Sequence, residues 1–184
     1  MRRMLTAKLR DSSGVLNRFT GVLSRRQVNI NSISVGPTEV KGISRVTVII
    51  EVENLDEVDL ITKQLNRLVD VVRVKDITDI PHLEMEVLLV KISAPASKRA
   101  EILAIIQPFR ASVVDVAPHS ITIQITGDAN KIEALLRVVQ PYGIKNLART
   151  GATGFSRDWF SSKMNPNLRW LDSLNASFNL VIVA

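Results

Sequence analysis

Residues 5–25, LTAKLRDSSGVLNRFTGVLSR, form the stretch that decides the fold. The first five alternate apolar and polar side chains, which is the period of a half-buried strand. The alternation breaks at residues 11–14, and from Val15 the apolar residues recur at helical spacing. This stretch therefore predicts a strand, a tight loop and a helix.

The alternation of strand and helix signals continues along the first part of the chain. Residues 28–35 and 43–52 return to strand character around a turn and predict a hairpin. Asn54 and Glu57 resemble a capping box that opens a second helix, and the β-branched run at 69–74 closes the unit. The order βαββαβ is typical of a ferredoxin-like unit, an antiparallel sheet with both helices on one face.

The same order of elements then repeats, which predicts a tandem α+β architecture. Strand patterns cover residues 85–92, 113–116, 121–125 and 144–148, and helical patterns begin at the candidate N-caps Ser97 and Asp128. We predict two tandem ferredoxin-like βαββαβ units, with domains at residues 1–79 and 80–157. Residues 158–184 match neither unit, and an accessory interaction segment, a disordered tail and a non-native extension all remain open.

Composition and charge exclude several classes of protein. Of the 184 residues, 46% are hydrophobic and 23% charged, which is enough apolar surface to form a core. The absence of cysteine excludes disulfides, thiolate zinc sites and a cysteine nucleophile. The net charge of +6 is spread, with 13 Lys and Arg against 10 Asp and Glu in residues 1–80 and 11 against 8 in 81–184. No apolar run approaches the roughly 18 residues that cross a bilayer, so we expect a cytoplasmic protein without a membrane partner.

Catalytic and metal-binding patterns are weak. His82 and His119 stand far apart in the sequence and are interpreted as turn residues. Glu84 and Glu86 share a strand face, for which a solvated strand edge is the favoured interpretation. Residues 149–154, RTGATG, could cradle an anion, but a plain exit loop is favoured. The sequence therefore predicts no active site and no metal.

The better candidate for a binding site is the loop at residues 11–16, where a strand ends and a helix begins. Unpaired N–H groups of the first helical turn attract a carboxylate or phosphate, and Gly14 permits close approach. The alternative is ordinary N-capping by Asp11 or a serine, worth about 0.5–2 kcal/mol, and spacing alone favours it.

A predicted edge strand supplies a second part of this candidate site. Asn29 and Asn31 carry amide groups there, and the apolar phase slips between Ile30 and Ile33, as at a bulge. Exposed edges tend to be paired or covered, and a second copy of the chain is one way to pair this edge. The loop of one copy and Asn29 of the other would then enclose a small amino acid, while an Asn29 that only satisfies a turn is equally compatible with the spacing.

Five segments, in this order, resemble the small regulatory subunit of acetolactate synthase, also called acetohydroxyacid synthase. They are Met1–Leu5, Asp11–Leu16, Val28–Ile30, Leu68–Val71 and Ala148–Gly151. The resemblance runs to about residue 157, and the first unit resembles an ACT domain. It implies a subunit without its own active site or cofactor, which activates a thiamine-diphosphate-dependent catalytic subunit where Mg and FAD are also expected. That large subunit condenses two pyruvates, or pyruvate with 2-oxobutyrate.

The resemblance also implies feedback inhibition by valine or another branched-chain amino acid, bound where the ACT domains of two chains pair as a homodimer. Motif matching implies an effector site made of Asp11, Ser12, Ser13, Gly14, Val15 and Leu16, with the partner's Asn29 and Ile30.

Two residues depart from the family pattern. The family commonly has Asn at the position of Asp11, whose charge attracts an ammonium and repels a carboxylate by on the order of 4 kcal/mol at 4 Å and an effective dielectric near 20. The family commonly has Gly at the position of Gln27, so the turn after the first helix is expected to differ.

Three other functions remain open. A free-standing ACT-type amino-acid sensor could regulate another enzyme, and an independent enzyme is a further possibility. A nucleic-acid binder fits the basic charge, but residues 43–52 lack the aromatic side chains that stack on bases. We therefore expect no nucleic acid partner.

Overall fold

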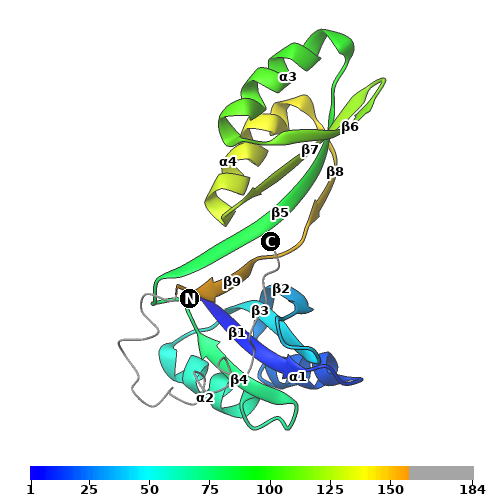
Figure 1. Cartoon of the computed structure of the whole chain (residues 1–184). Coiled ribbons are helices and arrows are strands. Elements are labelled where there is room, and N and C mark those ends of the chain that lie inside the picture. Colours follow the sequence, from blue (N-terminus) through cyan, green and yellow to red (C-terminus); the bar gives the residue numbers. More distant parts are fainter. Residues whose placement is uncertain (158–184) are drawn as a thin grey trace.

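The computed structural model describes residues 1–157, and the predicted atypical tail at 158–184 lies outside the described residues (Figure 1). The chain forms two βαββαβ units, which confirms the predicted fold class. The first unit comprises β1 (Arg2–Arg10), α1 (Val15–Arg25), β2 (Asn29–Pro37), β3 (Ile43–Glu51), α2 (Leu55–Leu65) and β4 (Val71–Asp76). The second comprises β5 (His82–Ser93), α3 (Arg99–Ile106), β6 (Ser112–Ala117), β7 (Ser120–Gly127), α4 (Ala129–Val139), β8 (Ile144–Arg149) and β9 (Thr153–Ser156).

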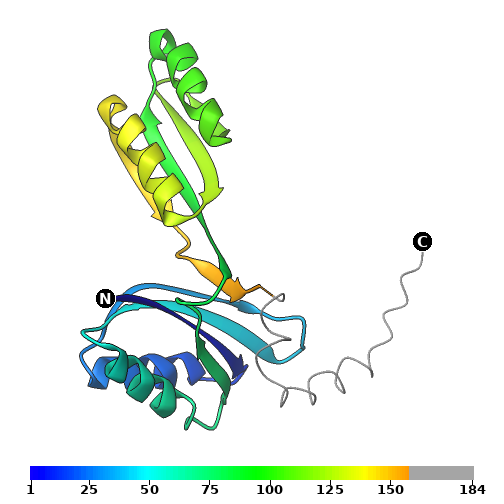
Figure 2. The same ribbon diagram turned by 90° about the vertical axis from the view of Figure 1, so that its left-hand side faces the viewer.

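The first sheet has the strand order β2-β3-β1-β4, with every neighbouring pair antiparallel. Helices α1 and α2 cover one of its faces (Figure 2). The alternating residues Leu5, Ala7 and Leu9 point into the core between sheet and helices, where Phe19 and Leu23 of α1 are fully buried. The apolar face of the strand and the apolar face of the helix, both predicted from the opening stretch, therefore pack against each other in one core.

The second sheet has the order β6-β7-β5-β8, with α3 and α4 on one face (Figure 1). Its core joins the inward residues of β5 and β7 to those of α3 and α4. Strand β5 is longer than its neighbours because its first four residues, His82–Met85, pair with β9 outside the main sheet. The β5–β9 ribbon connects the two units (Figure 2).

The segment that ends in β9 packs on the face of the first sheet that the helices leave open. Ala152 is buried there against Met4, Ile49 and Ile77. The Ala152 N–H donates to Ser32 Oγ at 3.0 Å. No sequence pattern predicted β9, because a four-residue strand that follows Gly151 and contains Gly154 looks like a loop until its partner is known.

The helix caps divide into predictable and unpredictable cases. Asn54 Oδ1 accepts from the Glu57 N–H at 2.9 Å, and Asp128 Oδ1 accepts from the Lys131 N–H at 2.8 Å, so both predicted caps are confirmed. The cap predicted at Ser97 is wrong. That residue lies inside a short 3-10 turn, Ala96–Lys98, and no side chain caps α3.

Within residues 1–157, two non-glycine residues have left-handed backbone, and they occupy equivalent places in the two units. Gln27 (φ 55°) follows α1, and Arg110 (φ 53°) follows the 3-10 turn after α3. The prediction that the turn at Gln27 differs from the one that glycine gives is wrong, because Gln27 itself adopts the left-handed conformation that glycine would supply.

None of the helices within residues 1–157 is both long and apolar enough to span a membrane.

Candidate effector site

The loop between β1 and α1 is held to the rest of the first sheet through Asp11. The Asp11 N–H donates to the Gly42 carbonyl at 2.9 Å, and the Ser44 hydroxyl donates to the Asp11 carboxylate. Asp11 therefore faces the start of β3 and is not the cap of α1. The residue that precedes the helix is Gly14, in left-handed backbone at φ 75°, with no side-chain cap. The N-capping interpretation of this loop is wrong.

The first turn of α1 offers backbone donors. Its earliest bond of the α-helical kind runs from the Arg18 N–H to the Gly14 carbonyl at 3.0 Å, so the Leu16 and Asn17 N–H groups precede the helical ladder. The positive end of the helix dipole lies at the same place. Such donors are typical of sites for small anionic groups. At Gly14 a Cβ atom would lie 3.2 Å from Arg18 Nη1, so the Arg18 side chain lies beside these donors.

An ion pair that sequence reasoning missed fixes the loop. Arg18 donates to Asp70 Oδ2 through Nη2 at 2.6 Å and Nε at 3.0 Å. The Ser12 hydroxyl donates to the other Asp70 oxygen at 3.1 Å, and Arg18 Nη1 donates to the Ser13 carbonyl at 3.3 Å. The hydrogen bonds from Arg18, ahead of the one from Ser12, lower the pKa of Asp70. Asp70 precedes β4, and only the fold brings it beside the loop.

The other predicted residues, Asn29 and Ile30, open the edge strand β2. The predicted slip is confirmed as an irregularity between Ile30 and Ser32, and the Asn29 amide donates to Asn31 Oδ1 at 2.9 Å. Asn29 lies opposite Glu51, which lies opposite Arg2 at the start of β1. The loop follows the other end of β1, roughly 26 Å away at 3.3 Å per residue. One chain therefore does not bring the two parts of the site together.

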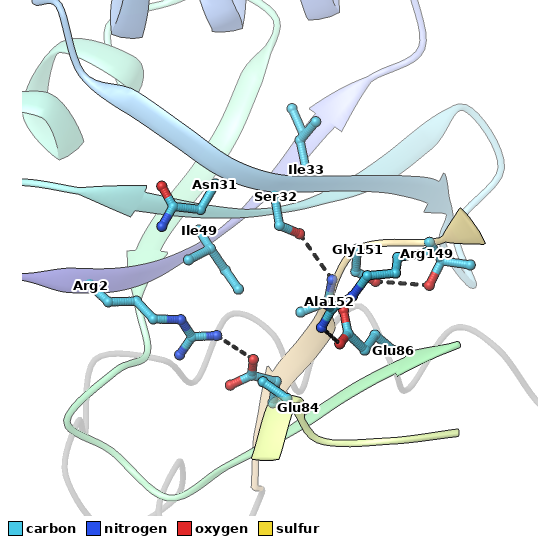
Figure 3. Close-up of a pocket in the computed structure, with 12 residues that line it drawn as sticks. Arg2, Asn31, Ser32, Ile33, Ile49, Glu84, Glu86, Arg149, Gly151 and Ala152 are labelled. Carbon is cyan, nitrogen blue, oxygen red and sulfur yellow. Dashed lines mark hydrogen bonds and ion pairs between the residues drawn. The ribbon is translucent and has the colours of Figure 1, made fainter. Parts of the chain in front are cut away.

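The carboxylates at positions 84 and 86 are ion-paired. Glu86 is buried and pairs with Arg149, which also donates to Glu133 at 2.7 Å, while Glu84 pairs with Arg2 (Figure 3). The hydrogen bond from Arg149 to Glu86 is the main cause that raises the pKa of Arg149. The interpretation of these residues as a solvated strand edge is wrong, because the return of β8 beside β5 covers Glu86.

The interpretation of residues 149–154 as a plain exit loop is only partly right, because Arg149 ends β8 and Thr153 begins β9. Residues 149–152 line a cavity of about 410 Å³ between the units. Gly151 and Ala152 face Ser32 of the first sheet across this region (Figure 3). Among residues 1–157, no three His, Cys, Asp or Glu side chains converge in a way that could hold a metal ion.

Comparison with known proteins provides independent evidence for the family of this chain. Residues 5–73 match the family model described as the AHAS small subunit-like ACT domain, and residues 85–158 match the model described as the small subunit of acetolactate synthase. The acetolactate synthase small subunit of Bacillus subtilis (strain 168) is 50% identical over 157 residues, which span 85% of this chain and 91% of that relative. The chain belongs to the acetolactate synthase small-subunit family. Family membership confirms the resemblance, with an ACT domain as the first unit.

Two further relatives support the assignment to the acetolactate synthase small-subunit family. The small subunit of Lactococcus lactis subsp. lactis (strain IL1403) is 60% identical over 157 residues, covering 85% of this chain and 99% of the relative. The crystal structure of the acetolactate synthase small subunit from Thermotoga maritima superposes with a TM-score of 0.79 at 29% identity, covering 85% of this chain and 98% of that one. An ACT domain in a small subunit supports a regulatory role.

Proposed function

We propose that this protein is the regulatory subunit of acetolactate synthase. It binds the thiamine-diphosphate-dependent catalytic subunit, raises its activity and transmits feedback inhibition by valine. The observation that carries the proposal is the match to small subunits of acetolactate synthase along 85% of the chain. Thiamine diphosphate, Mg and FAD belong to the catalytic subunit in this scheme, and this chain binds none of them.

The proposed effector site lies between two copies of the chain. Loop residues Asp11, Ser12, Ser13, Gly14, Val15 and Leu16 come from one copy, and Asn29 and Ile30 come from the other. The separation of the two parts within one chain supports this arrangement, because a free amino acid is far shorter than a nine-residue strand. The edge position of β2 supports it too, since an edge strand pairs readily with its own copy.

The charges of the loop suggest how an amino acid lies in it. The carboxylate of valine accepts from the N–H groups at the start of α1, where the helix dipole is favourable. Its ammonium faces Asp11, whose carboxylate already accepts from Ser44. In this orientation the charge at position 11 attracts the ligand and does not repel it.

The first test is co-purification of the full chain with the catalytic subunit of acetolactate synthase, followed by assay of pyruvate condensation with and without this chain. We expect a complex, a higher rate, and a loss of that rate on addition of valine. A chain that binds no catalytic subunit and leaves the rate unchanged contradicts the regulatory function. A chain that binds valine but no catalytic subunit is instead a free-standing sensor.

The second test asks whether the site is shared by two chains. Gly14→Asp removes the loop half and Asn29→Ala removes the partner half, so neither variant alone binds valine. When the two variants are mixed, half of the dimers combine both, and each of these holds one intact site. Calorimetry should then recover about one quarter of the wild-type sites, as follows from two-fold symmetry. A mixture that binds no valine places both residues in one site within a single chain, or in no site.

A further inference from the structure

The open face of the first sheet carries a row of positive charges. Lys8 on β1 lies directly opposite Arg45 on β3 and directly opposite Arg73 on β4. These three residues, the cationic row, cross three adjacent strands that are about 4.8 Å apart. Lys75 lies on the same face, opposite Thr6.

Like charges directly opposite each other on neighbouring strands destabilise a sheet. Among residues 1–157, one carboxylate pairs with the row, that of Glu39, whose oxygen lies 3.0 Å from Lys8 Nζ. Arg45 lies over the ring of Phe155 with its guanidinium carbon 5.6 Å from the ring centre. Burial, and after it the charge of Arg73, lowers the pKa of Lys75. Among the described residues, positive charges therefore outnumber negative charges on this face.

Apolar side chains lie beside the row. Val40, Val72 and Phe155 are each about half exposed, at 51%, 49% and 50%. Together with the cationic row and Lys75 they line a groove of about 360 Å³, which we name the basic groove. Helices α1 and α2 lie on the other side of the sheet, so the groove opens away from them (Figure 2). A surface that combines arginines, an aromatic ring and exposed apolar side chains is typical of a protein interface.

We propose that the basic groove docks an acidic amphipathic helix of the catalytic subunit. On a helix, residues three or four positions apart lie about 5–6 Å from each other, close to the spacing of neighbouring strands. Three carboxylates at such positions match Arg45, Lys8 and Arg73 when the helix crosses the strands. Apolar residues beside them then fill the groove between Val40, Val72 and Phe155. This inference rests on the proposed function, because it takes the catalytic subunit as the partner.

A nucleic acid fits the same face less well. Base stacking needs free aromatic rings, and Phe155, the aromatic side chain that lines the groove, already contacts Arg45. The neighbouring part of the sheet, at Met4 and Ile49, is covered by Ala152. An acidic helix needs a face only as wide as the three strands of the cationic row.

The test compares two double variants of the full chain with the same change of net charge. Arg45→Glu with Arg73→Glu reverses the charge of two arginines in the groove. The control, Arg67→Glu with Arg137→Glu, reverses the charge of two exposed arginines outside the groove. Binding to the catalytic subunit is measured by calorimetry at low and at physiological salt. We expect the groove variant to bind at least about tenfold more weakly and with a smaller salt dependence, and the control to bind like the wild type.

Valine binding and the thermal unfolding midpoint report whether the groove variant is folded, since the effector loop lies outside the groove. A folded groove variant that binds the catalytic subunit as tightly as the control overturns the docking surface and leaves the regulatory function standing. A wild-type chain that binds no catalytic subunit overturns both. Retention of the wild type on a single-stranded oligonucleotide, lost in the groove variant alone, overturns the proposal in favour of a nucleic acid.

Discussion

Replacement of Gln27 by glycine should stabilise the protein. Gln27 ends α1 in left-handed backbone at φ 55°, where its N–H donates to the Ser24 carbonyl and the next N–H, of Val28, donates to the Leu23 carbonyl. This pair of bonds closes the helix and requires the left-handed residue between them. The strain of a side chain in that conformation costs about 1–2 kcal/mol.

The expected gain from Gln27→Gly is smaller than the strain it removes. Glycine makes the unfolded chain more flexible, and this lowers the gain in the free energy of unfolding by about 0.5–1 kcal/mol. The net stabilisation is about 0.5–1 kcal/mol. For a unit of this size, this corresponds to a rise of about 2–8 °C in its unfolding midpoint.

Urea denaturation, followed by circular dichroism on the full chain, measures this difference in the free energy of unfolding. Gln27→Ala is the matched control, because alanine removes the side chain but keeps the left-handed strain. Arg110→Gly repeats the experiment in the second unit, where Arg110 and Ala111 donate to Gln107 and Ile106 in the same pattern. If Gln27→Gly is no more stable than Gln27→Ala, then backbone strain at this position is not what limits stability, and the reasoning fails.

Three further predictions concern the effector loop and the junction between the units. Gly14→Asp should abolish valine binding in calorimetry, since it puts a side chain and a negative charge at φ 75° where the ligand carboxylate approaches. Asp70→Asn should lower the unfolding midpoint at pH 7, and its difference from the wild type should shrink as the pH is lowered: the folded pKa of Asp70 lies below its unfolded value of 3.8, so the stabilisation from Arg18 is present at pH values above the unfolded pKa and is lost as the pH falls through the folded pKa. Gly154→Ala should loosen β9 from β5 and from the first sheet, because the new methyl group would lie 2.7 Å from the Leu83 carbonyl oxygen of β5 and 3.0 Å from Met4 Sδ of β1, and limited proteolysis should then cut between the units faster than in the wild type.

Local patterns predicted most of the fold because they are decided by neighbouring residues. Alternation at Leu5, Ala7 and Leu9 fixes one face of β1, and the caps at Asn54 and Asp128 bond to N–H groups three residues away. The irregularity in β2 was also predicted from the sequence, because the alternation of apolar and polar residues shifts between Ile30 and Ile33. The secondary structure of each unit therefore follows from interactions between residues that are close in the sequence, and the same patterns occur in both units.

Contacts between distant residues could not be predicted in this way. Arg18 and Asp70 are 52 residues apart, and Glu86 and Arg149 are 63 apart. A charged residue on a strand face looks solvated until the fold supplies its partner, which is why Glu86 was misassigned. The cap at Asp11 failed for a related reason: Ser44, on the neighbouring strand, takes the carboxylate that would otherwise bond to the helix.

The same strand that carries the proposed effector residues also contacts the second unit. Asn29 and Ile30 lie just before the irregularity in β2, and Ser32, just after it, accepts the hydrogen bond from the Ala152 N–H. Gly151 beside it has no room for a side chain, since a methyl group there would lie 2.6 Å from Ser32 Oγ. Pairing of β2 with a second copy therefore acts on a strand that is already packed tightly against the second unit. A change in that pairing would reach the second unit through this hydrogen bond and the close contact at Gly151, which is a physical basis for transmitting a change at the proposed effector site to the second unit.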